Sequence, residues 1–179
     1  ELFLYLNGLG TPSWDTFWQF VSNKRSAIPI YVCLLVLSYI KYGLKKTLVL
    51  VISVALLITV TDQLSNFFKY GVGRLRPCHD PELLDVMRLV KSRCGGKFGY
   101  FSAHAANSFA LAVFFWYTLK SELKNVSFML FIWAGLVAYS RVYIGVHFPL
   151  DILTGALIGS LFGWLFSKLF IFAIRKFSL

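Results

Sequence analysis

Carboxylates are scarce in this chain, which has eight acidic residues against eighteen lysines and arginines in a length of 179 residues. Histidine and cysteine occur only three times each, so every occurrence can be weighed separately. The sequence also lacks any Ser/Gly-rich linker, low-complexity tract or internal repeat that would divide it. These absences predict a single membrane-embedded domain over residues 1–179.

Apolar residues, by contrast, are abundant: 58% of the chain is hydrophobic and only 15% is charged. Several apolar stretches are long enough to cross a bilayer, which excludes a soluble protein and predicts an all-α, polytopic membrane bundle. The net charge of +10 is spread between the apolar stretches rather than gathered on one face. This distribution argues against nucleic acid and favours the bilayer as partner, and no obligate protein partner is inferred.

About five membrane spans are predicted, over residues 27–42, 47–68, 101–119, 126–144 and 149–174. Residues 1–25 are too broken for a span, but apolar residues recur at helical spacing after Pro12, at Trp14, Phe17, Trp18 and Val21. This pattern predicts an N-terminal amphipathic helix. Either the helix lies in the membrane interface, or it packs against the bundle as an ordinary helix.

Alternation of five spans brings residues 69–99, the start of the third span and the junction of the fourth and fifth spans to one face, the active face. The opposite face carries Lys41, Lys45, Lys46, Lys120, Lys124, Lys168, Arg175 and Lys176. The positive-inside rule makes that opposite face cytoplasmic, so the active face is predicted to lie in the periplasm of a bacterial inner membrane. A raw count argues the other way, because ten of the eighteen bases lie on the active face, but most of the acids accompany them there.

Two of the three cysteines, Cys78 and Cys94, fall in the 69–99 loop, whereas Cys33 lies in the first span. An oxidising compartment would allow the two loop cysteines to pair, although two unrelated thiols fit the sequence equally well. His79 stands beside Cys78 and Asp80, but this spacing matches no standard zinc site, and no metal is predicted.

A histidine and two charges interrupt the apolar sequence between the fourth and fifth spans. Arg141 precedes His147 by six residues, and Asp151 follows it by four with Pro149 between them. Proline favours the first position of a helix and aspartate its first turn, so Asp151 can fold back and hold the imidazole of His147. This is the orienting pair that a nucleophilic histidine needs.

Two further groups of polar residues are expected on the same face. Lys69, Arg74 and Arg76 follow the second span, and Ser102 and His104 open the third. Taken alone, the bases could be snorkelling charges and the histidine could be structural. Gathered in one place with Arg141, they form a cluster suited to phosphate, with helix N–H groups and a hydroxyl as additional donors.

Together these pieces resemble the motifs of the type 2 phosphatidic acid phosphatase family, the lipid phosphate phosphatases related to vanadium haloperoxidases. The family's first motif is lysine, six residues, then Arg-Pro, and its third is Ser-Arg, five residues, histidine, three residues, aspartate. Both are present here, at Lys69 with Arg76-Pro77 and at Ser140-Arg141 with His147 and Asp151. The second motif, normally Pro-Ser-Gly-His, keeps only Ser102 and His104.

The resemblance implies a two-step phosphoryl transfer that needs no metal or cofactor. His147 is the implied nucleophile and forms a phosphohistidine, Asp151 orients it, and His104 acts as acid and then as base. The residues implied to bind the phosphoryl oxygens are Lys69, Arg76, Ser102 and Arg141, with Arg74 as a weaker candidate that could bind a second phosphate or the head group.

The implied substrate is a phosphate on a membrane lipid, for which the bacterial members of the family suggest lipid A 1-phosphate or undecaprenyl diphosphate. Phosphatidylglycerophosphate and phosphatidic acid are alternatives, as is transfer of the phosphoryl group to another lipid. An anion or lipid transporter is a remote alternative, because a transporter has little use for the His147–Asp151 pair and no inverted repeat is evident.

Overall fold

The computed structural model describes residues 1–91, 94–121 and 123–177, and this part of the chain is helical and contains no β-strand. The helices, in order, are α1 (Leu2–Gly8), α2 (Pro12–Ser22), the 3₁₀ helix η1 (Lys24–Ala27), α3 (Ile28–Val72), the 3₁₀ helix η2 (Pro77–His79), α4 (Ala103–Leu119), α5 (Lys124–Tyr143) and α6 (Pro149–Lys176). The predicted all-α membrane bundle is therefore confirmed. The prediction of a single domain over residues 1–179 stays a prediction.

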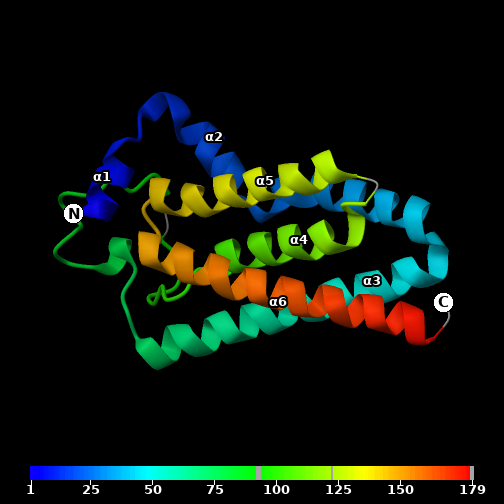
Figure 1. The fold of residues 1–179 in the computed structure, drawn as a ribbon. Coiled ribbons are helices and arrows are strands. Elements are labelled where there is room, and N and C mark those ends of the chain that lie inside the picture. The colour runs from blue at the N-terminus through cyan, green and yellow to red at the C-terminus, as the bar shows by residue number, and fades with distance from the viewer. Residues whose placement is uncertain (92–93, 122, 178–179) are drawn as a thin grey trace.

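The long helix α3 is a hairpin that contains the first two predicted spans. Gly43, at φ 70°, breaks the helical conformation inside it, and glycine adopts this left-handed region without steric cost. Figure 1 shows the two arms of α3 folding back on each other at the end of the bundle that also holds the C-terminus. The segment Lys24–Val72, α5 and α6 are each long and apolar enough to cross a membrane.

Helix α4 lies at the centre of the bundle, and α6 packs closely against it. The contact is made by Gly155, Gly159 and Gly163 of α6, where a Cβ atom would lie only 2.6, 2.1 and 2.3 Å from backbone carbonyl oxygens of α4 and its cap. Small residues at this spacing let two membrane helices approach backbone to backbone. The first turns of α4 and α6 are joined directly, because the Ser102 amide donates to the Asp151 carbonyl at 3.0 Å.

The N-terminal helices cover the opposite end of the bundle from the C-terminus (Figure 1). Trp18 of α2 stacks on Tyr143 with ring centroids 5.2 Å apart, so α2 packs against the end of α5. Trp14 and Phe20 remain 58% and 63% exposed on α2. Of the two alternatives for this segment, packing against the bundle is present, and α2 also keeps the exposed aromatic side chains typical of an interfacial helix.

The 69–99 loop, of which residues 92–93 lie outside the described part, folds back on itself beside the start of α6. Leu75 and Phe98 form an isolated antiparallel bridge, and the Gly99 amide donates to the Arg74 carbonyl at 2.9 Å. Cys78 and Cys94 form a disulfide with Cα atoms 6.0 Å apart. Of the two states that the sequence left open for these cysteines, the paired one is present.

Candidate active site

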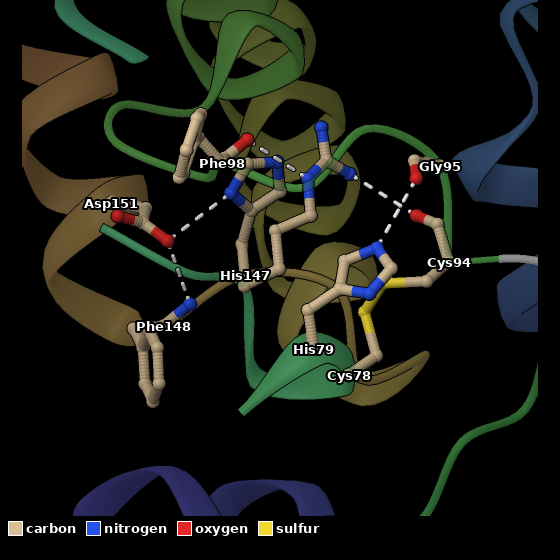
Figure 2. The surroundings of a disulfide bond; sticks show 9 residues. Cys78, His79, Cys94, Gly95, Phe98, His147, Phe148 and Asp151 are labelled. Carbon is tan, nitrogen blue, oxygen red and sulfur yellow. Dashed lines mark hydrogen bonds and ion pairs between the residues drawn. A yellow bond between two sulfur atoms is a disulfide. The ribbon is translucent and has the colours of Figure 1, made fainter. Parts of the chain in front are cut away.

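His147 lies in the tight turn between α5 and α6, and Asp151 holds it from the first turn of α6. The His147 amide donates to the Arg141 carbonyl at 3.2 Å, which fixes the backbone at the histidine. One carboxylate oxygen of Asp151 accepts from the Phe148 amide at 2.9 Å and lies 3.2 Å from Nδ1 of His147. Figure 2 shows the carboxylate between the ring and the amide. With Nδ1 occupied in this way, Nε2 is the nitrogen left for chemistry.

The imidazole of His147 is held in its neutral form. Its side chain is only 2% exposed, and burial, aided by the positive charges of Arg141 and Arg76, lowers its pKa from 6.5 to about 4 against the opposing hydrogen bond with Asp151. A neutral imidazole whose Nδ1–H points to a carboxylate has its lone pair on Nε2. An imidazole in this form is able to act as a nucleophile over the physiological pH range.

Arg74 binds the other oxygen of the Asp151 carboxylate. Its guanidinium forms an ion pair with that oxygen and lies 4.8 Å from the ring centroid of Tyr100 and 5.4 Å from that of Phe148. The weaker role predicted for Arg74, binding a second phosphate or the head group, stays a prediction. In the structure Arg74 neutralises and orients the carboxylate that holds His147.

Arg76 is held by the backbone of the disulfide-closed loop. Its Nε donates to the Phe98 carbonyl at 3.1 Å and one terminal nitrogen donates to the Cys94 carbonyl at 3.3 Å. Burial lowers the pKa of Arg76, while the Asp151 carboxylate opposes that shift. Figure 2 shows the disulfide at Cys94, whose carbonyl accepts from Arg76, so the Cys78–Cys94 bond constrains the loop that carries this guanidinium.

Lys69 and Arg141 reach the same region from the ends of α3 and α5. The charges of Arg76, Asp62 and Arg141 all act on Lys69, which places these groups around one space. Arg141 is 5% exposed and donates from one terminal nitrogen to the Ser22 hydroxyl, and its Nε has no hydrogen-bond partner among the residues that the structure describes. A buried guanidinium with an unused N–H is suited to bind an anion.

Ser102 and His104 open helix α4. The Ser102 hydroxyl accepts from the Ala105 amide at 3.5 Å as the helix cap, and the Ser102 amide donates to the Asp151 carbonyl, which joins α4 to α6. His104 lies in the first turn of the helix, and the charges of Arg141 and His147 act on it. The structure thus brings the two histidines together, while it gives Ser102 a structural task besides the predicted phosphate contact.

Sequence reasoning missed two lysines and a serine. Lys24 acts electrostatically on Lys69 and His104, and Lys91 acts on His104, so both add positive charge to the pocket. Ser22 supports Arg141. The signal available was topological: residues 22–24 immediately precede the first span and must lie on the active face.

His79 stands apart from the pocket. Its ring Nε2 lies 3.3 Å from the Gly95 carbonyl, as Figure 2 shows. Within residues 1–91, 94–121 and 123–177, no group of three or more His, Cys, Asp or Glu side chains is placed to hold a metal ion.

A cavity of about 560 Å³ extends from His104 into the bundle. Its polar end is formed by Lys24, Asp62, His104 and Asn107, and the Asn107 amide donates to the Asp62 carboxylate at 2.8 Å. The rest of its wall is largely apolar and is formed by both arms of α3, α4 and α5, including Leu34, Leu50, Val54, Leu111 and Phe115. A polar end at His104 and an apolar interior suit an amphipathic ligand.

The site combines a buried histidine–aspartate pair, a second histidine and several guanidinium and ammonium groups. In a membrane helical bundle, this combination defines a membrane-embedded phosphatase. The chain belongs to the PAP2 superfamily, whose family model matches residues 46–175. It is therefore a membrane lipid phosphatase.

The chain resembles two bacterial proteins over nearly its whole length. It is 39% identical to the lipid A 4′-phosphatase of Bacteroides thetaiotaomicron over 93% of this chain and 74% of that protein. It is 36% identical to the lipid A 4′-phosphatase of Porphyromonas gingivalis, over 97% of this chain and 73% of that protein. A putative undecaprenyl-diphosphatase of Escherichia coli, YbjG, is 33% identical over 66% of this chain and 56% of that protein.

Two solved structures share the fold. LpxE of Aquifex aeolicus has a TM-score of 0.66 and 29% identity, with 93% of each chain covered. The transmembrane PAP2-type phosphatidylglycerolphosphate phosphatase of Bacillus subtilis has a TM-score of 0.72, covering 97% of this chain and 84% of that one, and its 21% identity makes it evidence for the fold alone.

Proposed function

We propose that this protein removes the 4′-phosphate of lipid A at the periplasmic face of a bacterial inner membrane, through a phosphohistidine on His147. The observation that carries the chemistry is the neutral, buried imidazole held at Nδ1 by Asp151. The two lipid A 4′-phosphatases, 39% and 36% identical over most of the chain, favour this phosphate over the 1-phosphate or undecaprenyl diphosphate that the sequence suggested.

In the first step, Nε2 of His147 attacks phosphorus, so that a P–N bond forms while the P–O bond to the sugar breaks. Asp151 stabilises the positive charge that develops on the imidazole, and His104 gives a proton to the departing oxygen. Arg76, Arg141 and Lys69 stabilise the negative charge of the equatorial oxygens in the transition state.

In the second step, His104 takes a proton from water as the water oxygen attacks phosphorus. The new P–O bond forms, the P–N bond breaks, and His147 returns to its neutral form as inorganic phosphate leaves. Arg74 keeps the Asp151 carboxylate ionised and in place through both steps.

The apolar cavity supports a lipid substrate. Its polar end contains His104, and its volume of about 560 Å³ can receive part of an acyl chain while the phosphate stays among the charges. Surplus positive charge in the pocket, with Lys24 and Lys91 added to the motif residues, suits a head group of high negative charge.

The periplasmic placement rests on two observations. The Cys78–Cys94 disulfide belongs to the loop on the active face, and disulfides persist in oxidising compartments such as the periplasm. The lysines at the opposite end, including Lys41 and Lys176, fit the positive-inside rule.

The test is hydrolysis of a panel of purified lipids by the detergent-solubilised protein: lipid A phosphorylated at both positions, undecaprenyl diphosphate, phosphatidylglycerophosphate and phosphatidic acid. We expect inorganic phosphate to be released fastest from lipid A, leaving a product that mass spectrometry and NMR identify as the 1-phosphate. Loss of the 1-phosphate instead, or turnover of undecaprenyl diphosphate alone, would assign the other substrate. Transfer of the label to a second lipid without release of phosphate would indicate a phosphotransferase.

A further inference from the structure

Asn7 belongs to the short N-terminal helix α1. Its side chain is buried and forms hydrogen bonds to residues that are distant in the sequence. It is 1% exposed. Its side-chain oxygen accepts from the Arg88 amide at 2.7 Å, and its side-chain nitrogen contacts the carbonyls of Arg88, Val142 and Tyr143 at 3.0, 3.1 and 3.0 Å. One amide therefore ties together three segments: α1, the 84–91 stretch and the end of α5.

Two of these carbonyls belong to the last turn of α5, where backbone acceptors have no partner within the helix. Asn7 supplies a donor to them, so it acts as a cap provided by a distant element. The Val142 carbonyl also accepts from the Gly145 amide, and Asn7 is a donor to the Tyr143 carbonyl as well. A buried carbonyl without a donor is unfavourable, which accounts for a buried amide at this position. The cap fixes where α5 stops.

The turn that carries His147 starts from this capped end. Gly145, at φ 81°, donates to the Val142 carbonyl at 3.0 Å, and a Cβ atom on it would lie 2.8 Å from the Arg88 carbonyl. The Val142 and Arg88 carbonyls lie on either side of this turn, and both are also partners of Asn7. Only three residues separate Tyr143 from His147, so a shift of the helix end is transmitted to the imidazole.

We propose that Asn7 is a positioning residue for phosphoryl transfer: it locks the end of α5 to the 84–91 stretch and so sets the position of the attacking Nε2. Asp151 sets the orientation of the same ring from α6. The inference rests on the proposed role of His147 as nucleophile. It makes the N-terminal helix part of the catalytic apparatus, although no residue of α1 needs to touch the substrate.

The test compares two oxyanions in the full-length, detergent-solubilised protein. Orthovanadate adopts the geometry of the transferring phosphoryl group and bonds to the attacking nitrogen, so its affinity depends on where His147 lies. Inorganic phosphate reports only the cationic pocket. In Asn7→Ala we expect vanadate affinity and kcat to fall on the order of 30- to 100-fold, since a misplacement near 1 Å costs about that much. Phosphate affinity should stay within about twofold, because the cations are unchanged.

Gln19→Ala is the matched control, because the Gln19 side-chain amide also reaches from the N-terminal segment to the 84–91 stretch, where it donates to the Val90 carbonyl at 3.4 Å and not to a carbonyl of α5. Its vanadate and phosphate affinities should equal those of the wild type. Asn7→Ser retains a donor and should fall between Asn7→Ala and the wild type, and it serves in place of the alanine variant if that one does not fold.

Four outcomes are distinguished. Unchanged vanadate affinity in both Asn7 variants overturns the inference, and so does an equal loss of vanadate and phosphate affinity, which would show a general structural role. Tight vanadate binding by His147→Ala would instead overturn the proposed nucleophile. Loss of vanadate binding in His147→Ala, with a selective loss in Asn7→Ala, supports both.

Discussion

Replacing Gly155 by alanine is expected to slow turnover far more than it destabilises the bundle. A Cβ atom on Gly155 would lie 2.6 Å from the Ser102 carbonyl oxygen, whereas ordinary contact begins at 3.4 Å. The first turns of α4 and α6 must therefore separate by about 0.8 Å, the difference between those two distances. The carbonyl has little freedom to move aside, because it also accepts from the Ala106 amide at 3.0 Å.

That separation acts directly on the candidate site. Ser102 is joined to Asp151 by a backbone hydrogen bond of 3.0 Å, His104 follows in α4 and His147 is held by Asp151. A shift near 1 Å between acid and nucleophile costs about 100-fold in rate, so we expect kcat to fall by roughly 30- to 100-fold. Overpacking at one methyl group should cost only about 1–3 kcal/mol of stability.

The assay is phosphate release from a lipid phosphate, with thermal unfolding measured on the same preparations. Gly135→Ala is the matched control, since a Cβ atom there meets nothing within 4 Å, and it should leave both quantities unchanged. Gly159→Ala meets the Ala106 carbonyl at 2.1 Å, one turn further from the site, and should lower stability at least as much while affecting kcat less. Wild-type kcat in folded Gly155→Ala would refute the reasoning.

Four further results are expected. Because the pKa of His147 falls from 6.5 to about 4 on folding, the unfolded chain takes up a proton first as the pH falls. The free energy of unfolding should therefore fall by about 3 kcal/mol between pH 7 and pH 4, and thermal unfolding of His147→Gln should show a smaller fall. Breaking the Cys78–Cys94 disulfide, which spans 16 residues, should cost about 3 kcal/mol of stability and raise KM, whereas an unchanged unfolding temperature after reduction would argue against a constraining bond. Ser22→Ala should raise KM roughly tenfold, because the guanidinium of Arg141 loses its hydrogen bond to the Ser22 hydroxyl. The kcat of the same variant should change by less than its KM. Turnover should survive dialysis against EDTA, and activity that is lost there and restored by a divalent cation would contradict the proposed mechanism.

The helical bundle could be predicted from the sequence because hydropathy and charge report directly on membrane spans. The predicted third span, 101–119, coincides with α4 to within two residues. Gly43, between the first two predicted spans, is the residue at which α3 turns back. Chain alternation then gathers the ends of these spans on one face without any knowledge of side-chain contacts. The meeting of His104 and His147 follows from that alternation.

The supporting contacts could not be predicted, because they join polar residues that no periodic pattern connects. Ser22 and Arg141 are 119 residues apart, and Asn7 and Tyr143 are 136 apart. The sequence predicts Arg74 only as a weaker candidate for binding a second phosphate or the head group, and no sequence pattern indicates its ion pair with Asp151. Which partner a charged side chain takes depends on the fold of the loop, and the local sequence does not determine it.

The central claim is that His147 becomes phosphorylated, and the most direct measurement is to trap that species. His104→Ala removes the group that activates water but leaves the nucleophile intact, and p-nitrophenyl phosphate has a leaving group that needs no acid. On mixing the two, we predict a burst of p-nitrophenol that matches the enzyme concentration, and a phosphoryl group on the peptide that contains His147, stable to base and lost in acid. A label on another residue, or phosphate release by His147→Ala at the wild-type rate, would contradict the mechanism.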